Sequence, residues 1–374
     1  MLSHRRGTTL RILLVIEPSG GGSGRHVVDL ARALIGSGHQ VSLIWSPSRA
    51  EPWFEAAVAA LPLHASGRLP MRRSVGPWDV AALYALNRLI ARLGPFEIVH
   101  GHSAKAGALV RLAHAPGAAK IHTPHALPMM GQASLAKINA GAAEALLARS
   151  SDAIIAVSEE EAAVARRWGL GGNRLHVVPN GLASPPANDR LAARQALGVP
   201  EDALVIGFVG RLCAQKDPIR FDHAVRRAYA IDPRITGVMI GDGDLASAVR
   251  TAGGDVLRLL GSRDAGPLMA GFDLFAMTSR YEADSYAMIE AAALGLPMVC
   301  TDVGGIRRLI QAGARIDRLP VDASPDHLAE AMRAALASRV VALPITPGLL
   351  SASRMAEQTV RIYRDAFARR RLGG

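Results

Sequence analysis

Short apolar, β-branched runs alternate with longer segments rich in Ala, Leu and Arg along the 374 residues of the chain. This alternation predicts βαβ units, in which helices connect the strands of a largely parallel sheet. The first half is expected to hold strands at 11–16, 41–45, 97–100, 120–123, 153–157 and 175–178. Helices are expected at 25–37, 77–93, 104–113, 135–149 and 159–168.

The alternation is interrupted near residues 179–188, where turn-forming residues such as Pro179-Asn180-Gly181 gather. It resumes with strands expected at 205–210, 235–241, 256–260, 274–277 and 298–301. We therefore predict two open α/β domains with largely parallel sheets, residues 1–184 and 185–350, followed by a helical segment, 351–374. Because ligands of open α/β sheets bind beyond the carboxyl ends of the strands, two such edges facing each other would form a central cleft.

The composition describes a folded, basic protein. Hydrophobic residues make up 49% of the chain, and 43 basic against 32 acidic residues give a net charge of +11. This charge favours anionic partners, among them nucleotide phosphates, lipid diphosphates, a membrane surface and nucleic acid. Aromatic residues make up only 4% of the chain and no nucleic-acid recognition module is present, so we expect no nucleic-acid partner.

The cysteines and the hydropathy pattern indicate in which cellular compartment the protein is expected. Cys213 and Cys300 lie far apart without CxxC spacing, which indicates neither a disulfide framework nor a metal site. The apolar run at 10–16 is shorter than a signal-peptide core, and no run reaches the ~18 residues of a membrane span. We expect a cytoplasmic protein, with any membrane contact peripheral and at the cytoplasmic face.

Two carboxylates flank an expected strand-to-helix junction in the second half. Glu282 follows the strand expected at 274–277, and Glu290 lies more than a turn inside a helix that begins near Ser285. This spacing would let each acid bind hydroxyls of a different polyol, with free helix N–H groups between them for an anion. A helix-capping Glu and a solvated helical Glu are the alternative.

Glycine-rich and basic segments follow the first strand of each half. Gly20 to Gly24 opens a helix and would let the backbone approach a phosphate. The dinucleotide fingerprint G-x-G-x-x-G is not met, because Arg25 stands where the third glycine would be, counted from Gly20 and Gly22. Arg211 and Lys216, one of only four lysines, occupy the equivalent position in the second half and would bind a diphosphate. Asp242-Gly243-Asp244 is interpreted as a turn and not as a metal site.

Histidines end two expected strands of the first half, in His100-Gly101-His102-Ser103 and His122-Thr123-Pro124-His125. No third ligand follows either pair at a familiar metal spacing. A hydrogen-bonding or acid/base role fits a histidine at a strand end, while a structural role remains the alternative for His100, His102 and His122 taken singly.

Taken together, these segments resemble the family 4 retaining glycosyltransferases, which use nucleotide sugars and have the GT-B fold of two Rossmann-like domains. The resemblance also rests on Val157-Ser158-Glu159, Val178-Pro179-Asn180-Gly181, Lys216-Asp217-Pro218 and Asp302-Val303-Gly304-Gly305. It covers nearly the whole chain. Proteins of this kind often build bacterial surface polysaccharide on lipid-linked acceptors.

The resemblance implies roles for individual residues, in an acceptor-side domain at 1–184, a donor-binding domain at 185–350 and a final helix that crosses back. Catalytic roles fall to Glu282, which would bind the donor sugar, and to His125, which would face sugar and acceptor. Glu290 would bind the ribose, and the diphosphate would meet Gly21, Gly22, Arg211, Lys216, Asp284 and Ser285. No metal or other cofactor is implied, because the leaving phosphate itself would accept the acceptor's proton. Ala283 stands where the family commonly has glycine, which would narrow the donor pocket.

We therefore expect transfer of a sugar from a nucleotide-diphosphate donor to a polyprenyl-diphosphate-linked or other glycan acceptor. Two alternatives stay open: another GT-B sugar-nucleotide enzyme such as an epimerase, and a non-catalytic nucleotide-sugar binding subunit. Arg68, Arg72 and Arg73, with Leu69, Met71 and Trp78, would form a basic apolar edge for an anionic membrane, or a solvated loop.

Overall fold

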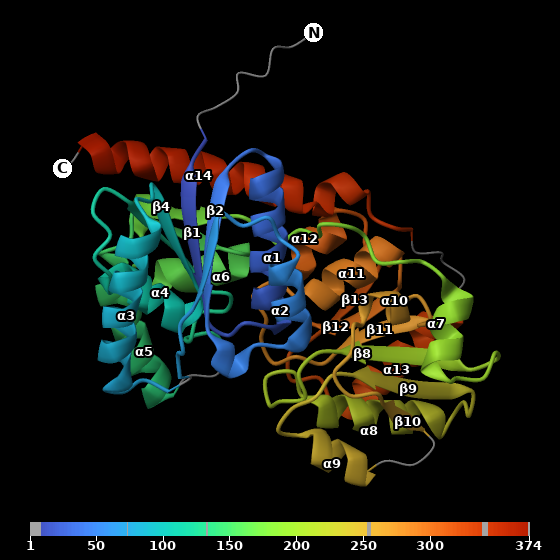
Figure 1. Cartoon of the computed structure of the whole chain (residues 1–374). Helices are drawn as coiled ribbons and strands as arrows, with labels where there is room; N and C mark the ends of the chain where they lie inside the picture. Colours follow the sequence, from blue (N-terminus) through green and yellow to red (C-terminus); the bar gives the residue numbers. More distant parts are fainter. Residues whose placement is uncertain (1–8, 73, 132–133, 253–255, 339–342, 373–374) are drawn as a thin grey trace. The chain divides into compact units, whose positions relative to one another are not determined.

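The computed structural model describes residues 9–72, 74–131, 134–252, 256–338 and 343–372 (Figure 1). The chain divides into two compact units: unit 1 is formed by residues 1–183 and 352–374, and unit 2 by residues 184–351. Each unit contains one sheet whose named strands pair in parallel, so the α/β architecture predicted from the alternating pattern is confirmed.

The sheet of unit 1 has seven strands in the order β3-β2-β1-β4-β5-β6-β7. The strands are β1 (Arg11–Ile16), β2 (Gln40–Trp45), β3 (Ala65–Arg68), β4 (Ile98–His102), β5 (Ala119–Thr123), β6 (Ala153–Ala156) and β7 (Leu175–Val177). The helices are α1 (Gly21–Gly36), α2 (Pro52–Ala59), α3 (Trp78–Leu93), α4 (Ser103–Leu112), α5 (Leu135–Ala148), α6 (Glu159–Arg167) and α14 (Ala352–Leu372).

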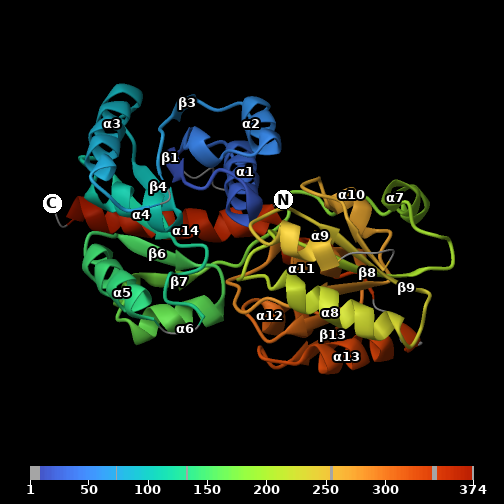
Figure 2. The same ribbon diagram turned by 90° about the horizontal axis from the view of Figure 1, so that it is seen from below.

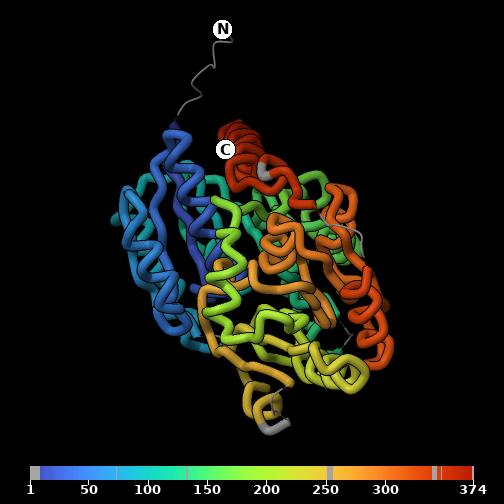
Figure 3. The backbone as a smooth tube through the Cα atoms, turned by 90° about the vertical axis from the view of Figure 1, so that its right-hand side faces the viewer, coloured from blue at the N-terminus to red at the C-terminus, as the bar shows by residue number. Residues whose placement is uncertain are grey.

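Alternation along β1 explains why this sheet needs helices on both faces. Ile12, Leu14 and Ile16 join a core formed with α1, α2 and α14, whereas Leu13 and Val15 join a second core formed with α3 and α4. A strand that is apolar on both sides is typical of a parallel sheet covered on both faces. Figure 3 shows β1 in blue and α14 in red, the first strand and the last helix of the chain, both within unit 1.

The sheet of unit 2 has six strands in the order β10-β9-β8-β11-β12-β13. The strands are β8 (Leu204–Val209), β9 (Ile235–Ile240), β10 (Leu257–Leu259), β11 (Leu274–Met277), β12 (Met298–Thr301) and β13 (Ile316–Leu319). The helices are α7 (Arg190–Leu197), α8 (Pro218–Tyr229), α9 (Ala246–Ala252), α10 (Gly266–Met269), α11 (Tyr286–Leu294), α12 (Ile306–Gln311) and α13 (Pro325–Ala337), seen from below in Figure 2.

Both sheets change direction of winding in the middle, between β1 and β4 in unit 1 and between β8 and β11 in unit 2. Such a switch point leaves a crevice beyond the carboxyl ends of the two strands, where ligands of this fold class bind. The candidate site residues follow these strands, as the next subsection describes.

Several details differ from the expectations. Helix α1 begins at Gly21 and not at 25, so most of the predicted glycine loop is the first helical turn. Leu69 and Met71 are buried in the core beneath α3, so they form no apolar edge. Arg73 lies outside the described residues. The elements α2, β3 and β13 were not predicted. The strands β3 and β13 lack the continuous apolar run by which most of the other strands were predicted.

A buried ion pair joins α4 to α5. The Arg111 guanidinium donates two hydrogen bonds to the Glu144 carboxylate, at 2.7 and 3.1 Å, and the two side chains are 0% and 7% exposed. Removing one partner of a buried pair leaves an uncompensated charge, which costs more than exchanging both partners for apolar groups.

Glu144→Ala is therefore expected to lower the free energy of unfolding by about 3–5 kcal/mol, measured by chemical denaturation of the full chain. The double variant Arg111→Met/Glu144→Leu should recover most of that loss. Glu159→Ala, which removes an exposed ion pair with Arg166, serves as the control and should change stability by less than about 1 kcal/mol. Equal losses for Glu144→Ala and Glu159→Ala would contradict the assignment.

Candidate functional site

In unit 2, the structure brings Lys216 and Glu282 together. Lys216 lies in the loop after β8 and Glu282 in the loop after β11, and Lys216 Nζ is 2.7 Å from Glu282 Oε1. The side chains are 16% and 8% exposed. Glu282 Oε1 accepts no hydrogen bond within the described part of the chain, so charge rather than hydrogen-bond geometry holds the pair.

Backbone contacts position each member of this pair. The Thr278 hydroxyl donates to the carbonyls of Lys216 and Asp217, at 3.1 and 2.9 Å, which ties the Lys216 loop to the end of β11. The Gly304 N–H donates to the Glu282 carbonyl at 3.2 Å. A Cβ at Gly304 would lie 2.5 Å from that oxygen, so only glycine permits this approach.

The helix after Glu282 begins where the sequence predicts. Ser285 is the N-cap of α11, and Glu290 is a buried residue in the middle of the helix. Asp284 is engaged by α12, since Arg308 Nη2 donates to both of its carboxylate oxygens at 3.0 and 3.1 Å. The Asp284 carboxylate therefore neutralises Arg308, which was not predicted as a site residue.

The remaining predicted residues of unit 2 are less constrained. Arg211 is exposed, and its guanidinium makes no ion pair with the described residues. Ala283 is buried between Glu282 and Asp284. The Asp242 carboxylate accepts a hydrogen bond from the Gly243 N–H at 2.8 Å, in the loop between β9 and α9.

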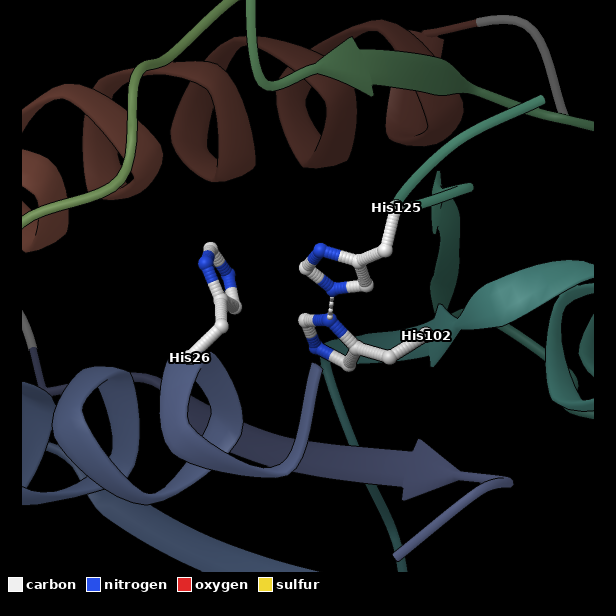
Figure 4. Close-up of side chains that lie close together, drawn as sticks. All are labelled: His26, His102 and His125. Carbon is white, nitrogen blue, oxygen red and sulfur yellow. Dashed lines mark hydrogen bonds between the residues drawn. The ribbon is translucent and has the colours of Figure 1, made fainter. Parts of the chain in front are cut away.

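In unit 1, five histidines lie close together near the carboxyl ends of β4 and β5: His26, His100, His102, His122 and His125. His102 ends β4, His125 follows β5, and His26 reaches them from α1 (Figure 4). His102 Nδ1 and His125 Nε2 share a hydrogen bond of 3.1 Å, and the His26 and His125 ring centroids are 4.5 Å apart. Behind them, His100 bonds Tyr363 and Thr123 at 2.6 and 2.8 Å. His26 was not predicted as a site residue.

Burial keeps these imidazoles neutral. Desolvation lowers the pKa of His26 to about 4, although a hydrogen bond with Asn180 acts in the opposite direction. Desolvation also lowers the pKa of His122, to about 3. Burial likewise lowers the pKa of His102 and His125 well below its ordinary value, and charge repulsion from neighbouring histidines adds to the effect. At neutral pH the cluster therefore offers uncharged donors and acceptors.

Three of these histidines have the distances of a metal site. One ring nitrogen each from His26, His102 and His125 lies within 4.8 Å of the others. His26 Nδ1, however, pairs with Asn180 Oδ1 at 2.8 Å, and His102 Nδ1 pairs with His125. His102 Nε2 is buried and has no partner among the described residues. The cluster is thus organised by hydrogen bonds between its members and their neighbours.

The backbone around His125 is held in an uncommon conformation. Ser103, His125 and Ala126 have φ angles of 75°, 54° and 87°, in the left-handed region that non-glycine residues seldom adopt. The buried Glu161 carboxylate accepts from the N–H groups of Ala126 and Leu127, at 2.8 and 3.1 Å. The spacing Ser158-x-x-Glu161 is the pattern of a helix-capping box, the sequence signal by which Glu161 was recognisable.

The predicted anion cradle carries a carboxylate of its own. The Gly21 N–H, at the start of α1, donates to Glu51 Oε1 at 3.2 Å. The other Glu51 oxygen accepts from the Trp53 indole N–H. Free N–H groups and the helix dipole favour an anion at this position, and the protein supplies one from the residue before α2. A phosphate at Gly21 and Gly22 would have to replace Glu51 or lie beside it.

Comparisons with known proteins agree with this architecture. Residues 20–183 match the family model Glycosyltransferase Family 4, and residues 203–338 match Glycosyl transferases group 1. The D-inositol 3-phosphate glycosyltransferase of Geodermatophilus obscurus is 30% identical over 66% of this chain and 60% of its own. The UDP-Gal:alpha-D-GlcNAc-diphosphoundecaprenol alpha-1,3-galactosyltransferase of Escherichia coli is 27% identical over 62% and 64%. The chain thus spans less than two thirds of the length of these two relatives.

A solved structure extends the likeness to the whole fold. The Anabaena protein HepE, in complex with UDP and glucose, has a TM-score of 0.74 at 19% identity and covers 95% of this chain and 98% of its own. The fold is that of the GT-B class. With both family models matched, one in each unit, the chain belongs to the family 4 glycosyltransferases. Among the described residues, no helix combines the length and the apolar character needed to cross a bilayer.

The buried histidines predict a pH-dependent stability. The pKa of His26 falls from 6.5 in the unfolded chain to about 4 in the fold, so its contribution is complete above pH 6.5 and is lost as the pH falls toward 4. This difference corresponds to about 3 kcal/mol. His26→Gln, which retains a polar partner for Asn180, should flatten the fall in unfolding free energy between pH 6.5 and 4. The exposed His64→Gln variant is the control, and an unchanged slope in His26→Gln would contradict the assignment.

Glu51→Gln tests the start of α1 as an anion site. Glutamine keeps an oxygen for the Gly21 N–H but removes the negative charge, so nucleotide diphosphate should bind about fivefold more tightly, equivalent to about 1 kcal/mol. Calorimetric titration with UDP, GDP and ADP measures this change. Unchanged or weaker binding of every nucleotide would mean that no phosphate approaches Gly21 and Gly22.

Proposed function

We propose that this protein is a retaining glycosyltransferase that moves a sugar from a nucleotide-diphosphate donor to a lipid-linked or other glycan acceptor during surface polysaccharide synthesis. The observation that carries the proposal is the Lys216–Glu282 pair beyond β8 and β11 in unit 2, within the segment matched by the group 1 glycosyltransferase model. A cation beside a carboxylate suits a ligand that has both an anionic diphosphate and sugar hydroxyls.

In the proposed mechanism, unit 2 binds the donor. The Lys216 ammonium and the exposed Arg211 guanidinium stabilise the negative charge that develops on the departing diphosphate. The N–H groups at the start of α11, near Asp284 and Ser285, add to that field. Glu282 accepts hydrogen bonds from the sugar, and Glu290 from the ribose.

The reaction exchanges one bond at the anomeric carbon for another. The bond from the anomeric carbon to the diphosphate oxygen breaks, and the acceptor hydroxyl forms its bond on the same face, so the configuration is retained. The acceptor's proton passes to the departing phosphate oxygen, and neither a protein nucleophile nor a metal ion takes part. Neutral His125 orients a sugar or acceptor hydroxyl, with His102 holding its ring.

Two relatives support the substrate class. The Escherichia coli relative is named for a UDP-sugar donor and a diphosphoundecaprenol-linked acceptor, and the Anabaena structure contains UDP and glucose. For the present chain we propose the same chemical classes, a nucleotide sugar and a lipid-linked glycan. We propose that it works at the cytoplasmic face of the membrane.

Lys216→Ala and Glu282→Ala should each reduce transfer by about 10²–10³-fold, because each removes a group that stabilises the bound donor or its leaving diphosphate. Transfer of radiolabelled sugar to membrane extract, after calorimetric screening for the preferred nucleotide, measures the loss. Arg227→Ala, which breaks an exposed ion pair with Asp326 elsewhere in unit 2, is the matched control.

Two readouts separate this proposal from its alternatives. The anomeric configuration of the product, determined by NMR, should equal that of the donor, and a chelator should leave the rate unchanged. Full transfer by Lys216→Ala would refute the assigned role. Conversion of the donor without acceptor would indicate an epimerase, and nucleotide binding without any turnover would indicate a non-catalytic subunit.

A further inference from the structure

Helix α3 carries an exposed apolar surface at the edge of unit 1. Val75, Val80 and Tyr84 are 87%, 73% and 65% exposed. Val80, Tyr84 and Arg88 follow each other at intervals of four residues and therefore lie on one side of the helix. The opposite side, with Ala82, Leu86 and Ile90, is buried in the core against β1 and α4. In Figures 1 and 2 α3 lies at the periphery of unit 1, beside α4.

Basic groups surround this apolar surface. Arg72 and Arg88 are exposed, and neither forms an ion pair with the described residues. The Arg72 guanidinium lies over the Trp78 ring, 4.8 Å from its centroid, which holds the charge beside the apolar side chains. We call Arg72, Val75, Trp78, Val80, Tyr84 and Arg88 the α3 edge.

Acidic charge is absent from the described part of this edge. The only carboxylate of α3 is Asp79, and Lys105 Nζ from α4 lies 2.6 Å from it. Asp79 also accepts from the Gly76 N–H at 3.1 Å, and Lys105 donates to the Ser74 carbonyl at 2.8 Å. The acid is therefore neutralised within the fold and fixes the loop that presents Val75. What remains exposed is apolar, aromatic and positively charged.

We propose that the α3 edge docks unit 1 on an anionic lipid surface. Aliphatic side chains with Trp and Tyr suit the boundary between headgroups and acyl chains, and unpaired arginines suit a negatively charged leaflet. Charge complementarity selects this occupant over a second copy of the chain, because two such edges would repel each other. The edge replaces the one expected from Leu69 and Met71, whose side chains are buried.

The proposal goes beyond sugar transfer and is tested without donor or acceptor, so its failure is distinct from failure of the proposed function. The full chain is sedimented with vesicles of phosphatidylcholine alone, or of phosphatidylcholine with an equal amount of phosphatidylglycerol. We expect binding to the anionic vesicles that weakens with added salt. Absence of that binding, or equal binding to both vesicles, would overturn the proposal.

Variants then locate the contact. Val80→Asp/Tyr84→Asp should abolish vesicle binding, and Arg72→Gln/Arg88→Gln should weaken it by about fivefold for each arginine removed. Leu191→Asp/Ile231→Asp is the matched control, since these unit 2 side chains are 69% and 62% exposed, and it should bind like the unaltered protein. Circular dichroism verifies that all variants are folded.

Two further outcomes would refute the α3 edge as a lipid contact. One is vesicle binding by Val80→Asp/Tyr84→Asp equal to that of the unaltered chain. The other is a concentration-dependent dimer, seen by analytical ultracentrifugation without vesicles, that Val80→Asp/Tyr84→Asp abolishes, because that result would make a second copy of the chain the occupant.

Discussion

Parallel strand pairing is the constraint on which both candidate sites depend. Because the strands of each sheet run in one direction, the loops that follow them emerge at the same edge. In unit 1 this brings His102, which ends β4, beside His125, which follows the neighbouring strand β5. In unit 2 it brings Lys216 beside Glu282, which follow β8 and β11. The sequence of either loop alone would not place these residues next to each other. The parallel sheet does so, because it holds the ends of its strands at one edge.

The free-energy cost of burying polar groups is reduced in a different way at each site. In unit 2 opposite charges compensate each other, in the Lys216–Glu282 and Arg308–Asp284 pairs. In unit 1 the imidazoles remain neutral, since burial lowers the pKa of each and a charge on one would repel the next. Unit 2 therefore supplies fixed charge, and unit 1 supplies uncharged hydrogen-bonding groups. This difference suits the proposed division between an anionic donor and the hydroxyls of sugar and acceptor.

Features of the fold and the sites that depend on neighbouring residues in the sequence could be predicted, whereas features that depend on distant segments could not. The bounds of β1, β11 and β12 follow directly from their apolar runs, and the loop position of Glu282 and the helical position of Glu290 follow from β11. Contacts between distant segments were not accessible. Glu51 reaches the start of α1 from 30 residues away, and His26 meets His125 only because α1 packs on the same sheet.

The α3 edge shows the same limit in another form. Apolar residues occur throughout 69–84, and periodicity alone does not say which of them face the core. Leu69 and Met71 follow β3 and are buried beneath α3. Val75 lies in the loop before α3, and Val80 and Tyr84 lie on the exposed side of the helix. Which of these residues are buried is determined by the packing of α3 on α4 and β1, and these segments are not adjacent in sequence.

Ala283 illustrates how the structure refines a departure from the family pattern. Glycine is required where φ is positive or where another backbone approaches closely, and both conditions apply nearby: Gly305 has a φ of 88°, and a Cβ at Gly304 would lie 2.4 Å from the Ala283 carbonyl oxygen. Ala283 itself is not among the non-glycine residues with positive φ. Its methyl group therefore adds volume without backbone strain, so any effect on the donor would come from the space that it occupies beside Glu282.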